Sequence, residues 1–149
     1  MNDTARVLLT GALLSGAAIS MFAWRVTQLD PDEADRLIGE LRLAQWMAVV
    51  LAGVSGIPIG IALSRLDVPL AHLDAALSVA FIGVAGFVLQ RDPREGLLVA
   101  SLGFIAHALV DIAHRPGWLP PDLSPRWFTA GCAVFNVYLA GWCFWARHR

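Results

Sequence analysis

The stretch LLVASLGFIAHALVDIAH, residues 97–114, is apolar for most of its length and carries three ionisable side chains toward its end. A hydrocarbon core of about 30 Å takes roughly 20 residues of helix to cross, so the stretch is long enough to span a membrane. Because lipid offers the backbone no hydrogen-bond partner, it must be helical. Four more stretches have the same character: residues 7–24, 43–64, 69–90 and 127–146. We therefore expect an all-α fold, an integral membrane bundle of five transmembrane helices, with residues 1–149 as a single transmembrane helical domain.

The overall composition supports a membrane protein and excludes several functions. The chain is 57% hydrophobic and 15% charged, whereas a soluble domain of this length needs more polar surface. The formal net charge is −1 and the basic residues are scattered, so we expect no nucleic-acid partner. All 11 basic residues are arginines, which excludes lysine-based catalysis. Cys132 and Cys143 lie about 16 Å apart along one predicted helix, too far for a disulfide.

The arginines also predict an orientation. In a five-span topology one face carries four of the 11 arginines and the other carries seven, and the positive-inside rule places the richer face in the cytoplasm. We expect a multi-pass protein of a bacterial inner (plasma) membrane, with its N-terminus outside and its C-terminus inside. Residues 1–24 could instead be a cleaved signal peptide. Trp24 followed by Arg25 is typical of an interfacial anchor and favours a retained helix.

Two features lie around the second stretch. Residues 30–46, DPDEADRLIGELRLAQW, start with a helix-capping signature, and we interpret them as an amphipathic lead-in that lies on the membrane surface. Their charged residues are expected to form a solvated face. In GVSGIPIG, residues 53–60, Gly56 and Gly60 favour close helix packing. The alternative is that Pro58 kinks the helix beside a cavity.

The three ionisable side chains of the opening stretch are His107, Asp111 and His114. Their spacing of i, i+4 and i+7 places them on one stripe of a helix. Ionisable groups at membrane depth are costly unless they are paired or face water, so this stripe should face the bundle interior.

Other polar side chains should lie in the same region. The stretch 69–90 begins at the same predicted outer face and supplies His72 and Asp74. The stretch 127–146 begins there too and places Asn136 at a depth similar to that of His107. We therefore expect a polar cluster in the outer half of the bundle.

Several chemistries are compatible with this cluster. His107, Asp111, His114 and His72 are ligand types for a divalent transition metal, with Asn136 and Asp74 as polar support. The same residues could relay protons, because imidazole titrates near neutral pH. A single imidazole could also ligate a porphyrin. The structural alternative is that Asp111 accepts hydrogen bonds within the bundle and that His72 and His114 lie in the headgroup region. No nucleophile stands out beside them, so the pattern does not decide whether the protein is an enzyme.

The loop RPGWLPPDLSPRW, residues 115–127, follows this stripe and is rich in proline and tryptophan. Proline restricts the backbone and tryptophan prefers the membrane interface. The loop could be a rigid lid over a cavity or an ordinary interfacial turn.

Two resemblances accompany these motifs. HALVDIAH at 107–114, followed by PRW at 125–127 and FNVY at 135–138, resembles small uncharacterised bacterial integral membrane proteins with an H-x3-D-x2-H element. That group tends to carry an aspartate where this chain has Asn136, and the resemblance implies a shared polar site. WLPP at 118–121 and YLAGWCFW at 138–145 are similar to motifs of the tryptophan-rich sensory protein family, whose five-helix members bind porphyrins and sterols. In that family the loop joins the first two helices, whereas here it joins the last two.

Three functional hypotheses follow. The first is a membrane protein that uses the His/Asp cluster to bind a metal ion, or to handle protons or a small substrate. The second is a non-catalytic accessory or assembly subunit of a larger membrane complex, with another membrane protein or a second copy as partner. The third is a porphyrin- or lipid-binding membrane protein. In each of them the lipid bilayer is a partner.

Overall fold

The computed structural model describes residues 3–63, 71–114 and 126–149, and these residues form five α-helices and no strand. The all-α prediction is therefore confirmed. The helix bounds are α1 Asp3–Thr27, α2 Ala34–Leu63, α3 Ala71–Val88, α4 Pro93–Ala113 and α5 Arg126–Arg147.

Helix length and hydropathy identify a multi-pass membrane protein. Helices α1, α2, α4 and α5 are each long and apolar enough to cross a bilayer, which implies contact with lipid. The fifth predicted span, 69–90, corresponds to α3, an apolar helix of 18 residues. At 1.5 Å per residue α3 measures about 27 Å, slightly less than the hydrocarbon core. The five predicted spans are thus four full-length candidates and one shorter apolar helix.

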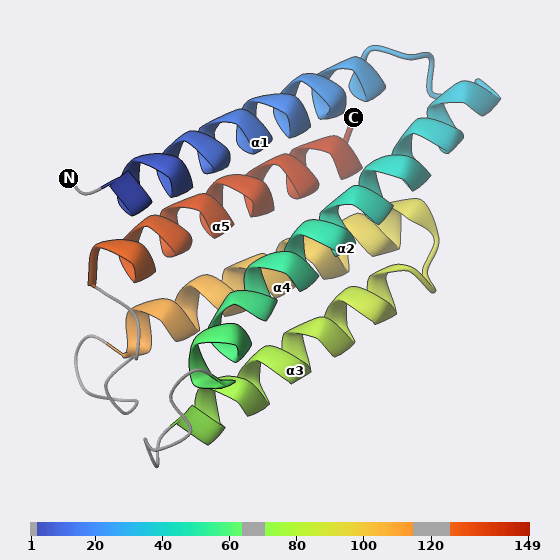
Figure 1. Cartoon of the computed structure of the whole chain (residues 1–149). Helices are drawn as coiled ribbons and strands as arrows, with labels where there is room; N and C mark the ends of the chain where they lie inside the picture. Colours follow the sequence, from blue (N-terminus) through green and yellow to red (C-terminus); the bar gives the residue numbers. More distant parts are fainter. Residues whose placement is uncertain (1–2, 64–70, 115–125) are drawn as a thin grey trace.

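Successive helices run in opposite directions (Figure 1). Helices α1, α3 and α5 therefore begin at one end of the bundle, and α2 and α4 begin at the other. Helix α4 packs against α2, α3 and α5, while α1 contacts only α2 and α5 within the described part of the chain. This arrangement brings the polar stripe of α4 against three other helices, while α2 contacts all four of the others.

An apolar layer fills the middle of the bundle. Leu51 of α2, Phe104 of α4 and Leu139 of α5 are fully buried and belong to one core cluster. They lie along the helices between the polar groups of one end and those of the other. Burying each such side chain contributes about 1.5–3 kcal/mol in water, although within a bilayer the gain comes from close packing rather than from dehydration.

The glycines of α2 do not pack as expected. A Cβ added at Gly56 or Gly60 would meet nothing within 4 Å, so no described residue packs closely against these positions. The tightest approach lies at Gly103 of α4, where an added Cβ would come within 2.9 Å of Leu51 and 3.1 Å of Val84. The absence of a side chain at Gly103 is therefore what lets α2, α3 and α4 meet closely.

Candidate functional site

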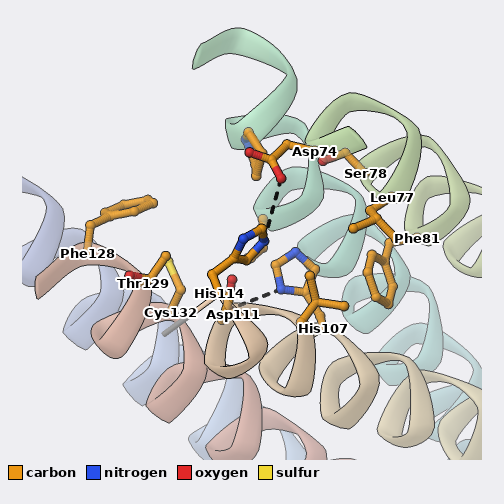
Figure 2. Close-up of a pocket in the computed structure, with 13 residues that line it drawn as sticks. Asp74, Leu77, Ser78, Phe81, His107, Asp111, His114, Phe128, Thr129 and Cys132 are labelled. Atoms are coloured by element: carbon orange, nitrogen blue, oxygen red, sulfur yellow. Dashed lines mark ion pairs between the residues drawn. The ribbon is translucent and has the colours of Figure 1, made fainter. Parts of the chain in front are cut away.

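A small cavity lies at the end of the bundle where α3 and α5 begin (Figure 2). Helices α2, α3, α4 and α5 all line it. Its volume is about 30 Å³, which is room for one or two water molecules. Its polar lining consists of Asp74, Ser78, His107, Asp111, His114, Thr129 and Cys132.

The deepest polar contact joins α4 to α5. His107 Nδ1 lies 3.4 Å from Asp111 Oδ2, one helical turn further along α4. Asn136 of α5 is fully buried, and its Nδ2 lies 3.0 Å from His107 Nδ1 and 3.4 Å from Asp111 Oδ2. The three side chains thus form one compact group, which we call the inner trio. The predicted stripe on α4 does face the bundle interior.

One buried atom of the inner trio has no hydrogen-bond partner within the described part of the chain. Asn136 Oδ1 is buried and makes no hydrogen bond to any described residue. A buried carbonyl oxygen without a hydrogen bond costs about 1–3 kcal/mol. Most buried polar side-chain atoms have a partner, so the oxygen of Asn136 is an exception.

A second imidazole–carboxylate pair joins α4 to α3. His114 Nε2 lies 3.5 Å from Asp74 Oδ1, and both side chains are largely shielded from solvent. Figure 2 marks this contact and the His107–Asp111 contact with dashed lines. The cavity therefore contains two histidine–aspartate pairs: His107 and Asp111 of α4, and His114, the C-cap residue of α4, with Asp74 of α3.

Apolar groups complete the wall. The Phe81 ring of α3 lies 4.8 Å from the His107 ring at an interplanar angle of 48°, so it restricts how the imidazole can turn. Val54 and Pro58 of α2 also line the cavity. Proline has no N–H to donate to the carbonyl one turn earlier, which belongs to Val54. The position of Pro58 beside a cavity agrees with the alternative interpretation of the proline.

Most of the predicted site residues lie close together in the structure. Asp74, His107, Asp111 and His114 line one cavity, and Asn136 lies directly against two of them. The side chain of His72 and the loop 115–125 lie outside the described part of the chain. Among the described residues, no group of three or more His, Cys, Asp or Glu side chains is placed to hold a metal ion. The metal site stays a prediction.

Sequence reasoning missed three polar residues of the cavity. Thr129 and Cys132 lie one turn apart on α5, and Ser78 lies one turn after Asp74 on α3. Thr129, Cys132 and Asn136 are spaced i, i+3 and i+7, so they occupy one face of α5. This spacing was visible in the sequence and could have identified the lining.

A second polar group lies at the opposite end of the bundle. Arg36 and Glu40 of α2 are only 1% and 2% exposed, so the prediction of a solvated face is wrong for these two residues. It is confirmed for the other charged residues of the segment, which are exposed: Asp30, Asp32, Glu33, Asp35 and Arg42. Arg36 Nε donates to Glu40 Oε1 at 2.7 Å, and Arg36 Nη1 donates to the Val26 carbonyl at 2.6 Å. Arg94 Nε donates to Glu40 Oε2 at 3.2 Å. We call Arg36, Glu40 and Arg94 the ion cluster; it ties α1, α2 and α4 together.

Arg36 and Glu40 are buried because each of them has a hydrogen-bond partner on a neighbouring helix. The segment 34–42 is the first part of α2 and continues directly into the rest of that helix. Its Arg36 and Glu40 share one helix face, which turns toward the end of α1 and the start of α4.

Comparisons of the chain with protein-family models, curated proteins and solved structures found no significant match.

Proposed function

We propose that this multi-pass membrane protein binds and releases protons at the cavity, with the two histidine–aspartate pairs as the acceptors. The observation that carries the proposal is the placement of both pairs around a space that fits one or two waters. Imidazole is the side chain whose unperturbed pKa lies nearest neutral pH, and water can carry a proton between groups that do not touch.

The position of the cavity supports exchange with one side of the membrane. The cavity lies at one end of the bundle, and the apolar layer of Leu51, Phe104 and Leu139 lies between it and the ion cluster. Among the described residues, the charged and titratable groups that face the cavity come from α3 and α4, and Cys132 adds a thiol from α5. This arrangement favours a site that takes up protons from one face. On the orientation predicted by the arginines, that face is the outer one.

The size of the cavity favours protons over larger ligands. Sites for drug-sized molecules have volumes of about 300–1,000 Å³, whereas this cavity measures about 30 Å³. Its walls hold acid–base groups without a grouped set of metal ligands among the described side chains. Among the functions of the first hypothesis, which were metal binding and the handling of protons or a small substrate, these features favour proton handling.

Histidine titration would test this function. The protein would be labelled with ¹⁵N-histidine, reconstituted in lipid nanodiscs and followed by NMR from pH 4 to pH 9. We expect the His107 and His114 signals, assigned by their loss in His107→Gln and His114→Gln, to titrate reversibly. His148 is exposed beyond the end of α5 and provides an internal reference for a solvated imidazole. If neither His107 nor His114 changes its protonation across this range, the proposed function is wrong.

A further inference from the structure

The amide of Asn136 contacts both members of a titratable pair through the same nitrogen. Nδ2 lies 3.0 Å from His107 Nδ1 and 3.4 Å from Asp111 Oδ2. A primary amide nitrogen carries two N–H donors and no acceptor. Both of its neighbours must therefore act as acceptors: His107 has to carry its proton on Nε2, and Asp111 Oδ2 has to be unprotonated.

This arrangement fits only the deprotonated state of the inner trio, whose net charge is then −1. It leaves Asn136 Oδ1 buried without a partner. His107 Nδ1 and Asp111 Oδ2, which lie 3.4 Å apart, are then both acceptors. The amide N–H groups that they share hold them together. The amide N–H groups stabilise the anionic pair, while the amide oxygen can still accept hydrogen bonds.

Adding one proton reverses these requirements. A proton on His107 Nδ1 or on Asp111 Oδ2 turns an acceptor into a donor that faces the amide N–H groups. When the added proton lies on Asp111 Oδ2 and cavity water moves the His107 proton from Nε2 to Nδ1, both neighbours are donors. A rotation of the amide by about 180° then replaces Nδ2 with Oδ1, which has two lone pairs and accepts from both. The rotated amide occupies almost the same volume, so the packed helices need not move.

We propose that the Asn136 amide is a proton-linked switch: it donates to the His107–Asp111 pair in the deprotonated state and turns over to accept when the pair takes up a proton. This inference rests on the proposed function. The proton comes from cavity water, and the net charge of the inner trio rises from −1 to 0. Asn136 acts as a positioning residue on α5 for acid–base groups on α4.

The charged surroundings of the switch are few. Among the described residues, α3 contributes Asp74, α4 contributes His114, and α5 contributes the Cys132 thiol to the same cavity. Helix α2 contributes only Val54 and Pro58 to the lining. Because Asp74 pairs with His114 at 3.5 Å, the inner trio has its own carboxylate and its own imidazole.

The tautomer of His107 is a direct readout, because ¹⁵N chemical shifts distinguish Nδ1–H from Nε2–H imidazole. In the wild-type protein we expect Nε2–H at pH 8.5 and a protonated Nδ1 after acidification. In Asn136→Asp no amide N–H faces His107 Nδ1, so nothing holds His107 in the Nε2–H form and Nδ1–H should appear already at pH 8.5. Asn136→Leu removes the donor at similar volume and should also release His107 to the Nδ1–H form, directed at Asp111.

The outcomes separate the two proposals. If His107 titrates but is already Nδ1–H at pH 8.5 in the wild-type protein, the switch is overturned and the proposed function stands. If His107 is Nε2–H and stays so in both Asn136 variants, Asn136 does not set the tautomer and the switch is again overturned. If no histidine of the cavity titrates, the proposed function itself fails. An unchanged far-ultraviolet circular dichroism spectrum verifies that each variant keeps its helices, and Asn136→Asp gives an independent result where Asn136→Leu does not fold.

Discussion

At one end of the bundle Arg36 and Glu40 form an ion pair that is almost completely shielded, while at the other end His107 and Asp111 pair beside a water-sized cavity. The ion cluster contains two guanidinium groups, which stay charged at every accessible pH. The cavity contains imidazoles, which do not. Both clusters join three helices, but only the cavity contains the side-chain type whose unperturbed pKa lies near neutral pH.

This difference separates two roles for polar groups at the ends of a membrane bundle. The ion cluster fixes the end of α1 to α2 and α4, because Arg36 binds the Val26 carbonyl and Glu40 binds both arginines. The contacts within the cavity pairs are longer, at 3.4 and 3.5 Å, than the contact of 2.7 Å between Arg36 and Glu40. We infer that the ion cluster serves stability and that the cavity serves titration.

The largest expected effect is the loss of Glu40. Glu40→Leu leaves Arg36 buried with no carboxylate, and an uncompensated buried charge destabilises a protein by about 3–5 kcal/mol. The matched control is Glu95→Gln, whose carboxylate is 63% exposed and lies 3.9 Å from Arg91; an exposed pair of this kind contributes about 0–1 kcal/mol. Reversible unfolding in mixed micelles would measure both. Equal losses for the two variants would contradict a stabilising role of the ion cluster.

The burial of Arg36 also shows where sequence reasoning ends. The apolar stretches predicted the helices, because lipid leaves the backbone no other solution. Charged residues at i and i+4 look identical in a sequence whether they are solvated or buried. The carbonyl of Val26 has no sequence signature, and Arg94 lies far along the chain.

The cavity was easier to anticipate than the ion cluster. The spacing of His107, Asp111 and His114 defines a stripe, and the alternating topology brings Asp74 and Asn136 to the same end. The pairing within that region depends on helix rotation, which hydropathy does not determine. The sequence thus predicted the neighbourhood of Asn136 but not that one nitrogen would contact both His107 and Asp111.

The next effect concerns the apolar layer between the two clusters. In Gly103→Ala the new Cβ would lie 2.9 Å from Leu51 Cδ2 and 3.1 Å from Val84 Cγ1. Overpacking costs about 1–3 kcal/mol and the higher helix propensity of alanine returns up to about 1 kcal/mol, so we expect a net loss of about 1–2 kcal/mol. Gly83→Ala meets nothing within 4 Å and should be neutral or stabilising. If the Gly103 variant is no less stable than the Gly83 variant, α2, α3 and α4 are not packed closely at this layer.

The smallest effect on stability belongs to Asp111→Asn, and it distinguishes the two ends most sharply. The substitution keeps the shape of the side chain and an oxygen that can accept from Asn136, so we expect a loss below about 1 kcal/mol. It removes the carboxylate that balances a proton on His107. Titration with an indicator dye from pH 4 to pH 9 should therefore show less proton uptake than in the wild-type protein, whereas Gly103→Ala should leave uptake unchanged. A large loss of stability with unchanged proton uptake would show that the His107–Asp111 pair serves stability, as the ion cluster does, and that the two ends do not differ in role.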